Sequence, residues 1–102
     1  MKDNGSKIVC RTPTPGKEST RIDKWKYYAI RRIILDLLAE HKKGLLFKDL
    51  PKLVSKKIRD KETRQNLGSI PWYTTTVKLD LEVKGEIERV PGKEPQMLRG
   101  KN

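Results

Sequence analysis

The sequence predicts a mainly α-helical domain that ends in a small β-hairpin. Three apolar patterns with a period near 3.6 residues indicate three helices, each bounded by residues typical of helix ends. A stretch of alternating polar and apolar residues near the C-terminus, followed by a turn cluster, indicates the hairpin. With 102 residues, of which 34% are hydrophobic, the chain fits one small domain with a modest core.

An N-terminal arm is predicted over residues 1–20, ahead of a domain formed by residues 21–102. The segment TPTPG at residues 12–16 contains two prolines, and each proline holds the preceding residue in an extended conformation. Ile8 and Val9 are the branched aliphatic residues of the arm. We expect the arm to be extended where it docks on the domain and flexible elsewhere, with part of residues 1–7 frayed.

The first helix is predicted over residues 22–41, with Asp23 in the first turn and Gly44 just beyond the end. Its apolar face comprises Ile30, Ile33, Ile34, Leu37 and Leu38. A short strand at residues 45–47 and a second helix at residues 48–58 follow, with Pro51 tolerated near the helix start. Residues 59–69 are polar and strongly charged, and this composition predicts a loop.

The third helix is predicted over residues 69–84, with Pro71 in its first turn and Gly85 after its end. At 100° per residue, the stripe expected to face the core comprises Ile70, Tyr73, Val77 and Leu81. A second apolar stripe lies nearly opposite and comprises Trp72, Leu79 and Val83. The narrow polar strip between them holds Thr75, Lys78 and Glu82. Residues 86–90 and 96–99 then form the hairpin around the turn at residues 91–95.

The order of three helices and a hairpin, with residues 76–89 (TVKLDLEVKGEIER) joining the third helix to the first hairpin strand, resembles a winged helix-turn-helix domain. The segments TPG at 14–16, RID at 21–23, PWY at 71–73 and TVKLDLEVKG at 76–85 are also similar to a family of small, functionally uncharacterised prokaryotic proteins. This resemblance covers about residues 9–99. It implies the winged-helix fold and assigns no activity, and residues 56–69 are more basic than the family pattern.

The chain is strongly basic, with a net charge of +11 and a pI near 10.0. Residues 45–69 hold seven basic and three acidic side chains, and the densest run comprises Lys52, Lys56, Lys57, Arg59, Lys61 and Arg64. A charge of this size favours a polyanionic partner, because released counterions drive binding. Nucleic acid is the expected partner, with DNA favoured over RNA. The alternative is a lysine-rich face that serves only solubility.

The residues expected to contact nucleic acid fall into three groups. Those expected to hold phosphates are Lys56, Lys57, Arg59 and Arg64. Those expected nearest the groove are Thr74, Thr75 and Lys78, and the hairpin would add Lys93 and Arg99. The third helix is poor in residues that read base edges and carries acidic ones. The sequence therefore predicts a small transcriptional regulator or chromosome-associated protein that binds by charge more than by base reading.

The second apolar stripe predicts a covered surface, because three large apolar side chains in water would form an exposed patch. Either the arm or another protein lies over Trp72, Leu79 and Val83, or the helix is rotated relative to the assignment made at 100° per residue. A dimerisation or protein-interaction module on the same scaffold is accordingly the alternative function. The first helix carries three aromatic residues, Trp25, Tyr27 and Tyr28, which are expected to pack in the core. The alternative is that they form a platform on which single-stranded nucleic acid stacks.

Several function classes are not expected. With one cysteine, Cys10, and one histidine, His41, we expect no disulfide, metal site, catalytic triad or cofactor, and no enzymatic activity. The sequence lacks a phosphate-binding glycine loop. The apolar runs are too short for a membrane span or a secretory signal, so a cytoplasmic protein without membrane contact is expected.

Overall fold

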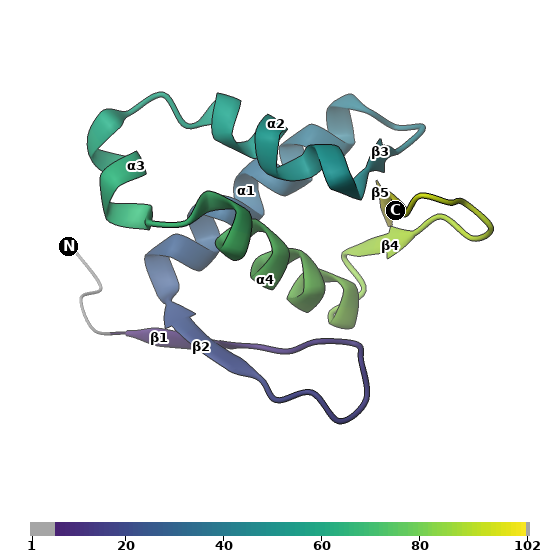
Figure 1. Ribbon diagram of the computed structural model, residues 1–102, viewed down its shortest axis with the longest axis horizontal. Coiled ribbons are helices and arrows are strands. Elements are labelled where there is room, and N and C mark those ends of the chain that lie inside the picture. Colours follow the sequence, from purple (N-terminus) through teal and green to yellow (C-terminus); the bar gives the residue numbers. More distant parts are fainter. Residues whose placement is uncertain (1–5, 102) are drawn as a thin grey trace.

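The computed structural model describes residues 6–101 and shows a mixed α/β fold with four α-helices and two small antiparallel sheets (Figure 1). Fraying was predicted for part of residues 1–7; residues 1–5 lie outside the described residues, and Lys7 is the first residue of strand β1. The elements are β1 (Lys7–Cys10), β2 (Thr20–Asp23), α1 (Lys24–Glu40), β3 (Leu45–Leu46), a 3-10 turn η1 (Phe47–Asp49), α2 (Leu50–Lys57), α3 (Lys61–Leu67), α4 (Ile70–Val83), β4 (Ile87–Arg89) and β5 (Met97–Gly100).

The predicted arm is a hairpin in which β1 and β2 pair antiparallel, with Ile8 opposite Ile22 and Cys10 opposite Thr20. The first helix therefore begins at Lys24, two residues later than predicted, because Ile22 and Asp23 belong to β2. Asp23 pairs with Lys7 at 2.5 Å and so closes the open end of the hairpin. Pairing fixes the strands of the arm, while its proline-containing connection forms the exposed tip.

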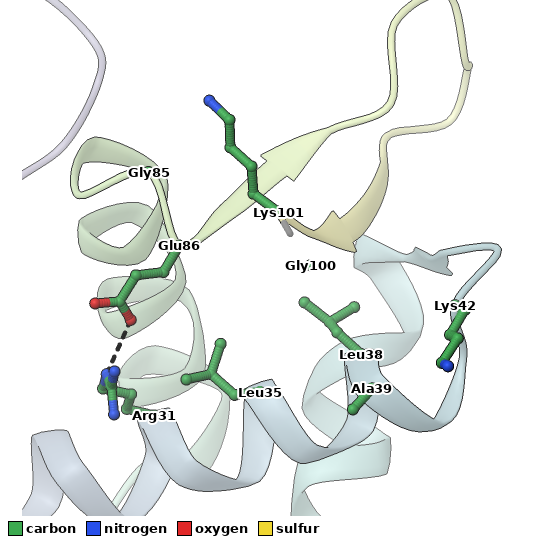
Figure 2. A pocket seen from close by; sticks show the side chains of 9 residues that line it. All are labelled: Arg31, Leu35, Leu38, Ala39, Lys42, Gly85, Glu86, Gly100 and Lys101. Atoms are coloured by element: carbon green, nitrogen blue, oxygen red, sulfur yellow. Dashed lines mark hydrogen bonds and ion pairs between the residues drawn. The ribbon is translucent and has the colours of Figure 1, made fainter.

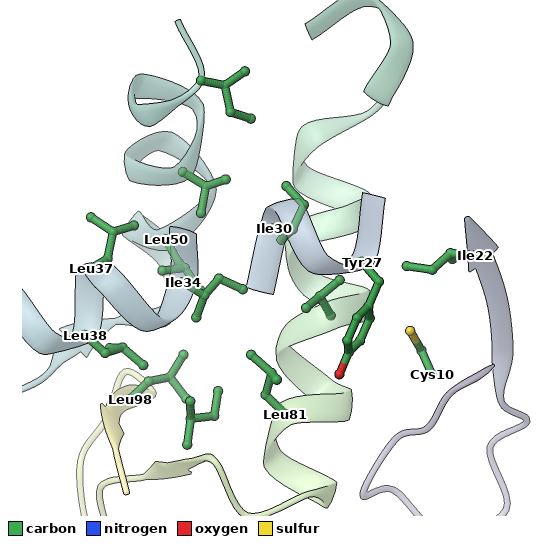
Figure 3. Close-up of a cluster of buried hydrophobic side chains, with 14 of the residues drawn as sticks. Cys10, Ile22, Tyr27, Ile30, Ile34, Leu37, Leu38, Leu50, Leu81 and Leu98 are labelled. Atoms are coloured by element: carbon green, nitrogen blue, oxygen red, sulfur yellow. The ribbon is translucent and has the colours of Figure 1, made fainter. Parts of the chain in front are cut away.

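The core lies where α1, α2 and α4 pack together, with the hairpin at one end and the second sheet at the other (Figure 3). The predicted first-helix face is buried at Ile30, Ile34, Leu37 and Leu38, and Ile33 packs partly against it. The other core side chains are Cys10, Ile22, Tyr27, Leu50, Val54, Ile58, Leu67, Val77, Leu81, Ile87 and Leu98. Apolar residues from every layer thus meet in one cluster, which is how a small domain gains enough buried surface.

The region predicted as a loop contains helix α3, so the expectation of three helices was wrong by one. The Asp60 carboxylate accepts the backbone N–H of Thr63 at 2.9 Å and caps the start of this helix. Arg64 donates to the side-chain and backbone oxygens of Ser55, which attaches α3 to α2. Leu67 is fully buried and provides the apolar anchor. One buried residue in seven leaves no periodic pattern, and this is why α3 was missed.

The C-terminal sheet has the strand order β3-β5-β4, so β5 pairs on both sides. The predicted hairpin and the short strand before the second helix are confirmed, with Leu45 opposite Leu98 and Arg89 also opposite Leu98. Gly44 adopts a φ of +113°, and a Cβ there would lie 3.0 Å from the Leu98 carbonyl oxygen. Close approach of the α1–β3 connection to β5 therefore requires glycine.

No helix among residues 6–101 is both long and apolar enough to cross a bilayer.

Candidate nucleic-acid interface

Helix α4 lies between α2 on one side and the β1–β2 hairpin on the other, as Figure 1 shows. Ser69 caps its start by accepting the backbone N–H of Trp72 at 3.3 Å, and Pro71 occupies the first turn as predicted. Val77 and Leu81 are fully buried against the core. The opposite side of α4 faces outward between α2 and the hairpin, and both of these elements carry exposed cations, among them Lys52, Lys56, Arg11 and Lys17.

A row of lysines runs from the 3-10 turn η1, which carries Lys48, along the outer side of α2, which carries Lys52 and Lys56. Lys48, Lys52 and Lys56 are all exposed and stand four residues apart, which is about 6 Å per step along a helix. They lie opposite the fully buried Leu50 and Val54. None of the three forms an ion pair with another described residue. Lys52 and Lys56 also line a cavity of about 480 Å³ with the start of α4. We call Lys48, Lys52 and Lys56 the α2 lysine row.

The other predicted phosphate contacts near α2 differ in availability. Arg59 is exposed, and within the described chain it has no ionic partner. Lys57 pairs with Glu40 at 3.1 Å, so its charge is partly neutralised. Arg64 is exposed but engages Ser55, which orients it without cancelling its charge. The contact of Arg64 with Ser55 therefore places Arg64 of α3 close to the end of α2, which carries Lys56 and is followed by Arg59.

Two of the residues predicted to lie nearest the groove are buried. Thr74 is fully buried and Lys78 is 1% exposed, so neither can contact a ligand on the surface of α4. Lys78 pairs with Glu82 at 2.6 Å and lies 4.3 Å from the centre of the Phe47 ring. Burial lowers the pKa of Lys78, and the Glu82 carboxylate counters part of that shift. The polar strip predicted there is thus part of the core boundary, in which Lys78 is buried and Thr75 and Glu82 are partly accessible.

Ion pairs occupy most cations of the C-terminal hairpin. Arg99 pairs with Glu88 at 2.5 Å, and Arg89 pairs with Glu82 at 2.6 Å. Lys93 stands at the exposed tip, and none of the residues described pairs with it. Of the two predicted hairpin contacts, Lys93 is therefore available and Arg99 is neutralised across the sheet.

The second apolar stripe of α4 is covered only in part. Leu79 lines a cavity of about 240 Å³ together with Thr76 and residues of the hairpin, among them Arg11 and Lys17. Trp72 is 47% exposed and Val83 is 40% exposed. Val9, one of the two branched aliphatic residues of the arm, is itself exposed. The hairpin thus borders the stripe at Leu79 and leaves both of its ends open.

A buried carboxylate joins the hairpin to α4. Asp80 is 1% exposed and accepts the Arg11 backbone N–H at 2.9 Å, the Tyr27 hydroxyl at 2.6 Å and the Lys84 ammonium at 2.8 Å. Burial alone would raise the pKa of Asp80, but these donors lower it below its usual value. Burial and the hydrogen bond to this carboxylate raise the pKa of Tyr27 to about 12.

Cys10 packs beside this network, where Figure 3 shows its sulfur facing Tyr27 and Ile22. The thiol is 3% exposed, and burial raises its pKa to about 11, with a further contribution from Asp80. A buried, protonated thiol is a poor nucleophile. The cysteine therefore serves as a packing residue that closes the junction of hairpin, α1 and α4.

Another cavity, of about 730 Å³, lies between α1 and the C-terminal sheet (Figure 2). Leu35, Leu38 and Ala39 of α1 form its apolar side, and Lys42 and Lys101 stand at its edges. Arg31 and Glu86 pair at 3.0 Å at one side of the cavity, which neutralises these two charges. In the described chain no group of three or more His, Cys, Asp or Glu gathers where a metal could bind.

Sequence reasoning missed some of the accessible cations. It did not single out Lys48, although its spacing of four and eight residues from Lys52 and Lys56 was a usable signal. Arg11 and Lys17 carried no such signal, because their position beside α4 depends on the fold of the hairpin. The aromatic side chains of the first helix also divide: Tyr27 is buried as predicted, whereas Trp25 and Tyr28 are exposed.

A family model described as a family of unknown function (DUF6958) matches residues 7–98. The matched region runs from β1 into β5, so the N-terminal hairpin and the C-terminal sheet belong to one family unit. This agrees with the resemblance to small uncharacterised proteins noted from the sequence motifs. No curated protein and no solved structure matches the chain.

Proposed function

The chain belongs to a family of unknown function, DUF6958, and we propose from its own residues that it binds nucleic acid, chiefly through phosphate contacts. The observation that carries this proposal is the α2 lysine row, three exposed lysines without ionic partners among residues 6–101. Each phosphate neutralised by a lysine releases counterions, and this release drives binding without reading bases. The net charge of +11 adds long-range attraction.

We also propose that the scaffold is a winged helix-turn-helix. The supporting features are the order of α1, α2 and α4 and the β4–β5 hairpin that follows them. Pairing of β3 with β5 ties the segment after α1 to this hairpin. In that scheme α3 is an insertion between the second and third helices, and Lys93 at the hairpin tip is the accessible contact of the wing.

The test is fluorescence anisotropy with a labelled random-sequence oligonucleotide, offered as duplex DNA, duplex RNA and single strand, at 50 and 200 mM salt. Wild-type protein should bind at low salt and lose affinity steeply at high salt. The salt slope is the fall in the logarithm of the binding constant per tenfold rise in salt, and each phosphate contact contributes roughly 0.9 to it. The triple variant Lys48→Gln/Lys52→Gln/Lys56→Gln should therefore reduce this slope by about two to three units. The comparison with RNA tests the expectation that DNA is preferred.

The matched control is Lys42→Gln/Lys43→Gln/Lys101→Gln, which removes the same charge from exposed lysines elsewhere. The control should retain most of the affinity and the salt slope. Equal losses in both triple variants would show that net charge alone is responsible and would remove the α2 lysine row as a site. Absence of binding to all forms at 50 mM salt would remove the proposed function.

The exposure of Trp72 and Val83 favours a second candidate, a protein-interaction module that associates through α4. Light scattering on wild type and on Leu79→Glu tests it. A dimer that dissociates in the variant supports this candidate, and a monomer in both cases rejects homodimerisation.

A further inference from the structure

The open side of α4 forms a strip whose composition differs from that of a base-reading helix. At 100° per residue, Trp72, Thr75, Leu79 and Val83 share the side that points away from the buried Val77 and Leu81. We call these four residues, with Thr76, the α4 strip. It offers no Arg, Asn or Gln to a base edge. The acidic residue beside it, Glu82, is neutralised by Lys78 and Arg89, each at 2.6 Å.

Cations lie near the α4 strip on the α2 side and on the hairpin side. On the α2 side, Lys52 and Lys56 line the cavity that reaches Ile70 and Pro71 at the start of α4. On the hairpin side, Arg11 and Lys17 line the cavity that reaches Thr76 and Leu79, together with one carboxylate, Glu18, so this side carries two cations and one anion. In the described part of the chain none of these four cations has an ionic partner. Lys52 and Lys56 therefore lie beside the N-terminal end of α4, and Arg11 and Lys17 lie beside Leu79; Figure 1 shows α4 between α2 and the β1–β2 hairpin.

Trp72 gives the strip an aromatic surface that contacts a neighbouring ring. Its ring meets Tyr73 edge to face, with centroids 4.8 Å apart and an interplanar angle of 85°. Tyr73 is fixed in turn by Lys26, whose ammonium lies 4.9 Å from the ring centre and 3.3 Å from the hydroxyl oxygen. Trp72 as a whole is 47% exposed, and Tyr73 contacts its ring from one side. An exposed indole in such a contact is suited to stacking on another planar ring.

We propose that the α4 strip binds a single-stranded segment of nucleic acid, with an unpaired base stacked on Trp72 and phosphates held by these cations of α2 and the hairpin. The inference rests on the proposed function and specifies its substrate class. A duplex presents phosphates outward and hides the faces of its bases, so it would contact the cations without using the apolar strip. An unpaired strand exposes both groups, which matches an exposed aromatic ring with cations nearby.

The experiment uses three probes of equal length and different chemistry: a twelve-nucleotide deoxythymidine strand, the same backbone with abasic residues, and a twelve-base-pair duplex. The deoxythymidine strand should bind at least about fivefold more tightly than the abasic strand, the lower bound for stacking one base. The chain has two tryptophans, so Trp25→Ala leaves Trp72 as the sole indole. Deoxythymidine should quench its fluorescence, and the abasic strand should not.

Trp72→Ala should abolish the preference for deoxythymidine over the abasic strand and leave abasic binding unchanged, whereas Trp72→Phe should keep part of the preference. Because Trp72 is exposed, circular dichroism should show the same fold in all variants. Equal binding of the deoxythymidine and abasic strands by wild type, or tighter binding of the duplex, would overturn the inference and leave the proposed function standing. Failure of all three probes to bind at low salt would overturn both.

Discussion

Replacing Asp80 by asparagine tests how the N-terminal hairpin is held against α4. Asp80→Asn keeps the shape of the side chain but removes the charge that accepts hydrogen bonds from Arg11, Tyr27 and Lys84. Hydrogen bonds to a charged group contribute about 1.5–3 kcal/mol each, and losing the partner of a buried charge costs more. The Lys84 side chain is 42% exposed and can turn to water, which limits the loss. We expect a fall of about 2 kcal/mol in the free energy of unfolding.

The assay is urea unfolding followed by circular dichroism at pH 7, with Asp36→Asn as the matched control. Asp36 pairs with Arg32 at 3.5 Å, and both side chains are exposed, so its replacement should change stability by less than about 0.5 kcal/mol. For a domain of this size, a loss of about 2 kcal/mol corresponds to a Tm decrease of roughly 8–16 °C. If Asp80→Asn costs no more than Asp36→Asn, the network does not stabilise the fold and the reasoning is refuted.

A second readout separates local detachment of the hairpin from global unfolding. Cys10 is 3% exposed and precedes Arg11, whose backbone N–H binds Asp80. In Asp80→Asn, a thiol reagent should label Cys10 faster than in wild type without denaturant. The labelling rate of Cys10 should exceed the rate expected if the thiol became accessible only when the whole domain unfolds. Unchanged labelling would show that β1 stays docked without the carboxylate.

Three further results are expected. The pKa of Asp80 is lowered in the folded state, so the contribution of this carboxylate to stability is fully present above about pH 4 and is lost as the pH falls through its folded-state pKa. The stability difference between wild type and Asp80→Asn should therefore be smaller in urea titrations near pH 2 than at pH 7. Leu81→Ala should cost about 2–5 kcal/mol because Leu81 is fully buried, whereas Val83→Ala, at a 40% exposed site, should cost less than about 0.5 kcal/mol in the same assay. Gly44→Ala should lower Tm more than Gly92→Ala, because both have positive φ but only the first would place a Cβ 3.0 Å from β5; equal shifts would contradict the crowding seen at Gly44.

Long periodic segments of this chain could be read from the sequence. The α1 face was predicted from Ile30, Ile34 and Leu38, since apolar residues at helix spacing are buried for the same reason in any compact fold. The α4 boundaries were predicted from Ser69, Pro71 and Gly85, because capping is a local property of the backbone. The hairpin at β4 and β5 followed equally from its period-two pattern.

Short or partnered elements could not be read in this way. Helix α3 depends on one buried residue, Leu67, and on the contact between Arg64 and Ser55. The β1–β2 hairpin depends on pairing between segments separated by the TPTPG connection. Propensity alone does not reveal these elements, because the interactions that stabilise them involve residues that are distant in the sequence.

The candidate site divides along the same line. The basic character and the Lys52–Lys56 spacing were visible in the sequence, since composition and helical period need no tertiary information. Which cations are free was decided by the fold, which pairs Arg99 with Glu88 and Lys57 with Glu40 and buries Lys78 beside Phe47. A charge is neutralised by whatever lies within a few ångströms of it, and packing determines those neighbours.

By itself, the amino-acid sequence determined where the longer helices and the C-terminal hairpin form and that the surface is rich in positive charge. Only the tertiary structure decided that the N-terminal hairpin is tied to α4 through Asp80, that Trp72 stays exposed, and that cations of α2 and of the hairpin lie beside α4. The physical reason is range: helix periodicity and capping act within a few residues, whereas burial, ion pairing and exposure depend on segments that meet only after folding.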